Sequence, residues 1–263
     1  MTSYQMDDLL AIMARLRDPE QGCPWDIKQT FRSIVPYTLE EAYEVADAIE
    51  RQSYDELKDE LGDLLFQTVF YARIAEEEGR FQFKDCVQAI CDKLVRRHPH
   101  VFAESADNHS VENADQVLQN WEALKSEERK ASGQHSVLDN IPAAMPALSR
   151  AYKLQKRCAN VGFDWSDVAG AWDKVKEEVA EVEELPTDSP ALAEELGDLL
   201  FALVNVIRKH KLEPEGVLRQ ANSKFERRFR AVEAELTKLG KTPQQSDLIE
   251  MDALWEMVKR QAR

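Results

Sequence analysis

Apolar residues recur along this chain with the spacing of an α-helix. Val175, Val179 and Val182, for example, follow one another at intervals of three or four residues and form an apolar stripe. No segment alternates polar and apolar residues for long enough to indicate a β-strand. The pattern predicts helices near residues 4–17, 38–51, 54–78, 83–97, 113–130, 146–158, 168–185, 190–211, 214–238 and 247–261.

The composition favours an all-α fold. Only 9 glycines and 10 prolines occur among the 263 residues, while strong helix formers such as Leu, Ala, Glu, Lys and Arg are plentiful. Hydrophobic residues make up 43% of the chain and charged residues 32%, which is typical of a globular chain and not of a disordered one. Loops are expected at Gly22–Asp26 and at Leu185–Pro190.

The chain contains an internal duplication. The heptapeptide ELGDLLF occurs at Glu60–Phe66 and again, identically, at Glu195–Phe201. Three further pairs of segments recur in the same order at nearly constant offset: EEAYEV (Glu40–Val45) with EEVAEV (Glu177–Val182), DKLVRR (Asp92–Arg97) with SKFERR (Ser223–Arg228), and WEALK (Trp121–Lys125) with WEMVK (Trp255–Lys259). Each half of the chain is therefore expected to be one copy of a single helical unit.

The boundary between the two repeats is expected in the stretch ASGQHSVLDNIPAAMP. This stretch begins with a Ser-Gly pair and contains two prolines, as linkers often do. The sequence therefore predicts an N-terminal repeat at residues 1–131, a linker at 132–145 and a C-terminal repeat at 146–263.

Charge and segment patterns limit the partners and the location of the protein. The formal net charge is −15, and an acidic surface repels nucleic acids and anionic membranes, so neither is an expected partner. The N-terminus lacks the pattern of a signal peptide, and no apolar run approaches the length of a membrane span. The cysteines form no C-x-x-C pair, so a zinc site is not expected. Reduced thiols and a cytoplasmic location are the expectation.

The second repeat places four carboxylates on two neighbouring helices. Glu178 and Glu181 are three residues apart beside the apolar stripe, and Glu195 and Asp198 are three apart on the next helix. The short loop between these helices makes them antiparallel neighbours, so the four carboxylates can converge. Converging charges at the edge of a core are unfavourable without a partner.

A hard divalent cation with oxygen ligands would remove this repulsion. Mg²⁺ is the expected ion, with Mn²⁺ as an alternative, because Mg²⁺ takes carboxylates and reaches out to substrate phosphates. The first repeat offers the equivalent set, which consists of Glu41, Glu44, Glu60 and Asp63. The alternative is a solvated acidic face. Gly62 and Gly197 lie inside the predicted helices, where glycine is unfavourable, and indicate a close approach there.

A group of basic and polar residues on one predicted helix could hold phosphates. Its members are Asn222, Lys224, Arg227, Arg228 and Arg230, and lysine and arginine are the usual phosphate ligands. The alternative is a solvated basic face. The first repeat has Cys91 or Asp92 where the second has Asn222. Trp255 and Lys259 could cover a base or reach a phosphate, although a tryptophan in the core is an equal alternative.

These motifs resemble the MazG family of the all-α nucleoside triphosphate pyrophosphohydrolases. The family pattern EExxE followed by ExxD occurs in both repeats, and GCPWD (Gly22–Asp26) and RRHPHVF (Arg96–Phe102) also resemble MazG. The resemblance covers nearly the whole chain. It implies a helical dimer in which Glu178, Glu181, Glu195 and Asp198 bind Mg²⁺. Glu40 and Glu177 belong to the motif, but their spacing places them either behind the residues that bind the metal or in solvent.

The resemblance also implies an activity. Water would attack the α-phosphate of a nucleoside triphosphate, ribo or deoxy, and release the monophosphate and pyrophosphate. A spare glutamate oxygen could take the proton, and Glu178 and Glu195 are the candidate catalytic residues. The second repeat is expected to be the main catalytic unit, because only this repeat has Asn222 beside Lys224 and Arg228.

Two other classes of protein remain as alternatives. A di-iron carboxylate bundle would require Glu-x-x-His motifs, and the chain has none. A non-catalytic helical scaffold or regulatory binder could also use tandem repeats. The chain lacks a P-loop, a G-x-S-x-G motif and an H-E-x-x-H motif, so metal-assisted hydrolysis is the remaining catalytic mechanism.

Overall fold

The computed structural model of the chain describes residues 3–102 and 136–261, together with residues 113, 116, 117, 120, 121, 124, 127 and 128. Lys125, most of the helix expected near 113–130 and the first part of the expected linker lie outside the described residues. Within the described ranges the regular elements are helices, so the predicted all-α class is confirmed. The chain divides into two compact units, Met1–Glu127 and Glu128–Arg263.

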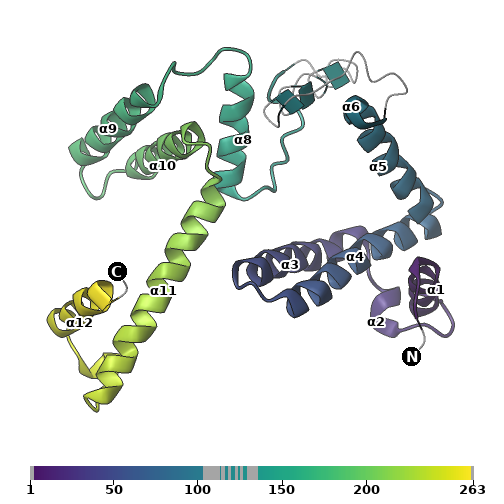
Figure 1. Cartoon of the computed structure of the whole chain (residues 1–263), viewed down its shortest axis with the longest axis horizontal. Coiled ribbons are helices and arrows are strands. Elements are labelled where there is room, and N and C mark those ends of the chain that lie inside the picture. The colour runs from purple at the N-terminus through teal and green to yellow at the C-terminus, as the bar shows by residue number, and fades with distance from the viewer. Residues whose placement is uncertain are drawn as a thin grey trace. The chain divides into compact units, whose positions relative to one another are not determined.

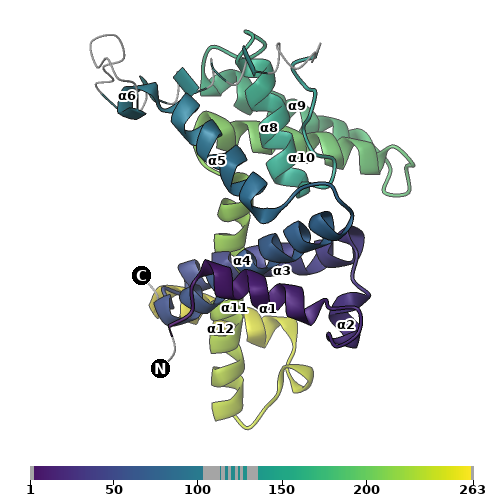
Figure 2. The ribbon, with the colours of Figure 1, turned by 90° about the vertical axis from the view of Figure 1, so that its right-hand side faces the viewer.

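The first unit is built around a pair of long helices. Its described helices are α1 (Met6–Leu16), α2 (Pro24–Ile27), α3 (Phe31–Glu50), α4 (Tyr54–Glu77), α5 (Phe83–Arg97) and α6 (Pro99–Phe102). Helices α3 and α4 pack along each other, and α1 packs on α4 (Figure 2). The buried core joins Met13 of α1, Ile34 of α3 and Phe70 of α4. Burial of these apolar side chains stabilises the helix pair that carries the first set of carboxylates.

The N-terminal part of this unit differs from the sequence-based expectation in two places. Helix α3 begins at Phe31 and not near residue 38, because the side chains of Thr30 and Ser33 form a capping box that starts the helix upstream of Pro36. The expected loop at Gly22–Asp26 becomes a single helical turn from Pro24, since proline suits the first position of a helix. Gly22 is required before this turn, because a Cβ there would lie 2.4 Å from the carbonyl oxygen of Leu16.

The second unit repeats the central helix pair, with one helix before it and a long and a shorter helix after it. Its described elements are α8 (Ala147–Ala159), α9 (Val168–Glu184), α10 (Leu192–Lys209), α11 (Pro214–Lys238), the 3₁₀ turn η2 (Pro243–Gln245) and α12 (Leu248–Gln261). Helices α9 and α10 lie side by side, as do α11 and α12 (Figure 1). The predicted loop between α9 and α10 is confirmed.

Each helix pair of the second unit has its own buried cluster. Ala171, Val175, Ala202 and Val206 join α9 to α10, whereas another set, Val232, Leu236 and Val258, joins α11 to α12. In the described part of the chain no helix has both the length and the apolar character needed to cross a membrane. All the cysteines are free thiols.

Candidate functional site

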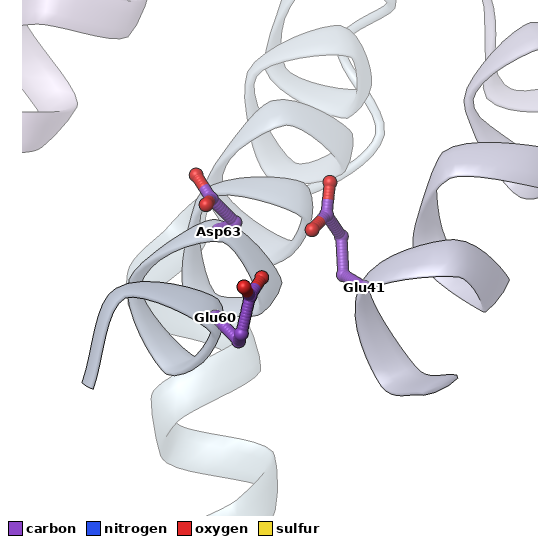
Figure 3. A group of neighbouring side chains, drawn as sticks. All are labelled: Glu41, Glu60 and Asp63. Carbon is purple, nitrogen blue, oxygen red and sulfur yellow. The ribbon is translucent and has the colours of Figure 1, made fainter. Parts of the chain in front are cut away.

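Three carboxylates of the first unit converge between α3 and α4. One oxygen each from Glu41, Glu60 and Asp63 lies within 4.8 Å of the others, and Figure 3 shows Glu41 facing the two residues of α4. Gln67 donates a hydrogen bond from Nε2 to Glu41 Oε1 at 3.3 Å. Glu44 is exposed and stands outside this group of three, although it lies close enough to Glu41 to affect its titration.

The electrostatics of the first cluster disfavour three bare charges. Loss of hydration raises the pKa of Glu41, and the charges of Asp63 and Glu44 raise it further. The pKa of Glu60 is raised by the same loss of hydration and then by Glu44 and Asp63. Each raised pKa means that ionising one more carboxyl group in this cluster costs free energy.

The second unit brings together the equivalent carboxylates in a different subset. One oxygen each from Glu178, Glu181 and Glu195 lies within 4.8 Å of the others. Glu178 is only 4% exposed, and its Oε1 forms an ion pair with Lys174 Nζ at 2.6 Å. Its Oε2 is buried and has no hydrogen-bond partner. Loss of hydration raises the pKa of Glu181, and the charge of Glu178 raises it further.

A hard divalent cation fits the donor set of the second cluster. The ligating atoms are all carboxylate oxygens, which Mg²⁺ and similar ions prefer. The buried Oε2 of Glu178 lacks the partner that a buried charged oxygen requires. Lys174 neutralises only part of the negative charge, because it is shared with Glu177 at 2.8 Å. Both acidic clusters could therefore hold a metal ion, and the second has the more buried ligand.

Each repeat gathers three of the four carboxylates that the sequence analysis named. The fourth is Glu44 in the first repeat and Asp198 in the second, and both are exposed. Gly62 and Gly197 face open space, since a Cβ on either would meet nothing within 4 Å. The close approach expected at these glycines is therefore absent from the described residues of this chain.

A cavity of about 490 Å³ adjoins the second cluster. Glu178, Asp198 and Lys174 are among its lining residues, and Phe163, Trp165 and Phe201 supply aromatic surface. The volume lies within the range of small-molecule sites, and a mostly apolar lining with a few polar groups is typical of them. The arrangement can hold a molecule that is charged at one end and flat and apolar at the other.

The aromatic wall of this cavity is fixed by the two helices beside it. Gly170 of α9 makes room for Trp165, because a Cβ at that glycine would lie 2.3 Å from the indole ring. Asp164 pairs with Arg208 at 2.6 Å and with Lys209 at 2.9 Å, both at the end of α10. Burial raises the pKa of Asp164, but the hydrogen bonds from these two cations outweigh burial and hold the pKa below its ordinary value.

The candidate phosphate-binding residues lie on α11, apart from the carboxylates. Helix α11 packs against α12, α8 and α10. Asn222, Lys224 and Arg227 are exposed, and across the described ranges none of the three forms a hydrogen bond or an ion pair with a carboxylate of the cluster. The structure thus leaves their side chains exposed, on a different helix from Glu178.

Arg228 and Trp255 come together across α11 and α12. The guanidinium carbon of Arg228 lies 5.9 Å from the centre of the Trp255 ring. Phe225 packs on the same tryptophan, with 5.2 Å between the two ring centres. Trp255 also contacts the buried α11–α12 cluster, so it is partly a core residue. Lys259 forms an ion pair with Glu256 at 2.6 Å.

The paired carboxylate helices match one protein family twice. The model of the MazG nucleotide pyrophosphohydrolase domain matches residues 29–102 and again residues 167–232. The chain belongs to this family. Both MazG segments contain a helix pair with its four candidate carboxylates, and the second also contains Asn222, Lys224, Arg227 and Arg228.

Relatives of this MazG chain match it over nearly its whole length. A nucleoside triphosphate pyrophosphohydrolase of Escherichia coli (strain K12) is 56% identical over 261 residues, covering 98% of each chain. A Thermotoga maritima protein named nucleoside triphosphate pyrophosphohydrolase/pyrophosphatase MazG is 41% identical over 253 residues, covering 96% of this chain and 95% of its own. An uncharacterized Bacillus subtilis protein is 43% identical over 263 residues, which are 99% of this chain and 53% of that one.

Several residues of this MazG site were missed by the sequence analysis. Lys174 precedes Glu178 by one helical turn, so the spacing of the two residues could have revealed it. Asn205 is a polar residue within the apolar run LFALVNVI, and this break in the run could have identified it as a candidate site residue. Gln155 lines the cavity from α8, and nothing in the local sequence distinguishes it from a surface residue.

Proposed function

We propose that this protein hydrolyses nucleoside triphosphates, ribo or deoxy, to the monophosphate and pyrophosphate with Mg²⁺ as cofactor, or Mn²⁺ in its place. The observation that carries the proposal is the second carboxylate cluster at the edge of an aromatic-lined cavity. Metal-binding oxygens and a flat apolar pocket in one place suit a phosphate chain joined to a base. The names of the two relatives from E. coli and T. maritima support the same reaction.

The metal would be held by carboxylates of α9 and α10. Glu178, Glu181 and Glu195 supply the converging oxygens, and Asp198 completes the set from the cavity edge. Bound Mg²⁺ would neutralise phosphate charge and acidify water. The buried Oε2 of Glu178, which lacks a partner, supports this assignment. The first repeat, with Glu41, Glu44, Glu60 and Asp63, is proposed as a weaker or structural metal site.

The reaction proposed is attack of water at the α-phosphorus. The bond to the bridging oxygen breaks, and pyrophosphate departs as one group. A glutamate oxygen, of Glu178 or Glu195, accepts the proton of the attacking water. Lys174 lies at the cavity edge and carries the positive charge nearest to this cluster, so its ammonium can hold a phosphate oxygen.

A homodimer would complete this site. The helices with the carboxylates leave large apolar side chains exposed, among them Trp172, Leu196 and Leu200, and such surfaces favour association. Pairing of like units could also bring the basic residues of α11 in one copy to the carboxylates of the other. Light scattering is expected to give at least twice the 30.1 kDa mass of the chain; a monomer at micromolar concentration would contradict the dimer.

The division of the chain and its location also stay proposals. We retain a linker at residues 132–145 between two repeats, with the second repeat as the main catalytic unit. A cytoplasmic location fits a nucleotide substrate, and neither nucleic acid nor a membrane is a proposed partner of a chain with a net charge of −15.

A panel of nucleoside triphosphates and their deoxy forms tests the function directly. With Mg²⁺, the purified protein should convert them to monophosphate and pyrophosphate, as separated by ion-exchange chromatography. Chelation should stop the reaction, and added Mg²⁺ should restore it. A protein that binds none of these nucleotides and hydrolyses none would be a scaffold, and tightly bound iron would indicate the di-iron alternative.

A further inference from the structure

Two buried amide residues line the cavity beside the second cluster. Gln155 of α8 is 7% exposed and Asn205 of α10 is 6% exposed, and both line the cavity. A side-chain amide has one end that accepts hydrogen bonds and one that donates them. Which end of each amide remains for a ligand depends on what holds the other end.

The partner of Gln155 fixes its orientation. Its Nε2 donates a hydrogen bond to the backbone carbonyl of Phe201 at 2.8 Å. A carbonyl can only accept, so the amide cannot be reversed without losing this bond. The remaining end is Oε1, which is buried and has no hydrogen-bond partner. Gln155, a residue that lines the cavity, therefore keeps a buried acceptor without a donor, and buried polar atoms normally have partners.

The partner of Asn205 fixes the opposite orientation. Its Oδ1 accepts hydrogen bonds from Arg208 Nε at 2.9 Å and from Arg208 Nη2 at 2.6 Å. A guanidinium can only donate, so the oxygen must face Arg208. Asp164 holds this arginine in place at 2.6 Å. The end that remains is Nδ2, a donor with no partner among the residues that the structure describes.

We infer that Gln155 and Asn205 read the edge of the base and favour a lactam, in which a ring N–H adjoins a carbonyl. This inference rests on the proposed function. The Gln155 oxygen accepts from the ring N–H, and the Asn205 amide donates to the carbonyl. Uracil, thymine, guanine and hypoxanthine carry such an edge. Adenine and cytosine present an amino donor beside a ring nitrogen acceptor, which reverses both contacts.

The position of Asn205 suits a base whose phosphates lie at the metal site. Asn205 follows Asp198 by two helical turns, so it lies on the same face of α10, about 10 Å further along the axis. A ribose and a base can span this separation. The aromatic rings of Phe163, Trp165 and Phe201 offer stacking surface to the base between these two points.

The first repeat lacks an amide side chain at the position equivalent to Asn205. The duplicated ELGDLLF segments align Phe70 with Asn205 and Arg73 with Arg208. Phe70 is 1% exposed and belongs to the core, so an apolar ring stands where the second repeat has an amide. The arginine is kept in both repeats, but Arg73 pairs with Glu76 and Glu77 instead. We therefore assign recognition of the base edge to the second repeat.

The test compares matched bases on the full chain with Mg²⁺. We expect kcat/KM for UTP to exceed that for CTP, and that for ITP to exceed that for ATP, each by about tenfold or more. Asn205→Leu and, separately, Gln155→Met should reduce both ratios to within about twofold, mainly by raising KM for UTP and ITP. Gln244→Leu, at an exposed position of η2, is the control and should keep the wild-type ratios.

The outcomes separate this inference from the proposed function. Equal kcat/KM for UTP and CTP and for ITP and ATP in the wild-type protein would overturn the inference and leave the hydrolase intact. Ratios that persist in both folded variants would also overturn it. Failure to hydrolyse any of the four nucleotides would instead overturn the proposed function. Circular dichroism of each variant checks the fold, and the wild-type ratios test the inference without any variant.

Discussion

The buried carboxylate of Glu178 gives the sharpest prediction about metal binding. Mg²⁺ at about one hundred times its dissociation constant stabilises the folded protein by about 2.7 kcal/mol. At about 2–4 °C per kcal/mol for a chain of this size, the unfolding temperature should rise by about 5–10 °C. Glu178→Gln should abolish this rise, because the substitution removes the most buried ligand of the second cluster.

The structure indicates that Glu178→Gln is tolerated when no metal is bound. Lys174 keeps its ion pair with Glu177 at 2.8 Å, so its charge retains a partner. The amide is uncharged, and the second terminal atom of residue 178 stays unpaired as in the wild-type protein. The metal-free variant should therefore lie within about 1–2 kcal/mol of the wild-type stability.

The assay is calorimetry with and without Mg²⁺ in a Glu41→Gln background, which disables the first cluster. Glu177→Gln is the matched control, because Glu177 also contacts Lys174 but lies outside the group of three carboxylates. This control should keep the full Mg²⁺-dependent rise. An equal rise in the Glu178→Gln protein would refute the assignment of this carboxylate to the metal.

Three further predictions follow from other parts of the structure. Glu195→Ala should reduce kcat at least a hundredfold while Glu60→Ala keeps most activity; the reverse result in steady-state assays would exchange the roles of the repeats. Burial raises the pKa of Glu77, but hydrogen bonds from two arginines outweigh burial and lower it. Its contribution is therefore complete above the unfolded pKa of about 4.3 and lost as pH falls through the folded value. Glu77→Gln should cost about 2 kcal/mol at pH 7, and urea unfolding should show this cost shrinking as the pH falls below the unfolded pKa. Gly170→Ala should displace Trp165 and raise KM for nucleotides about tenfold. An unchanged KM would show that Trp165 does not contribute to nucleotide binding.

Local sequence signals predicted the bounds of several helices well. Helix α5 spans Phe83–Arg97 and α11 spans Pro214–Lys238, as the apolar periodicity indicated. The expected start of α3 near residue 38 was wrong, because the capping box at Thr30 begins the helix upstream of Pro36. The apolar periodicity does not record the cap at Thr30, and this cap can outweigh the unfavourable Pro36 inside the helix.

The site was predicted less completely than the fold. The spacing of Glu178 and Glu181 on one helix and Glu195 on the next was enough to predict their convergence. The cavity was not predictable, because Gln155 of α8 and Asn205 of α10 meet only through tertiary packing. Their free hydrogen-bonding ends depend on partners such as Arg208, and spacing along the sequence carries no such information.

The central claim is that water attacks the α-phosphorus, and hydrolysis in ¹⁸O-labelled water tests it most directly. Mass spectrometry of the products should find one labelled oxygen in the nucleoside monophosphate and none in the pyrophosphate, with no nucleoside diphosphate accumulating. Label in pyrophosphate would place the attack at the β-phosphorus. Label in orthophosphate, with nucleoside diphosphate as the product, would contradict the proposed reaction.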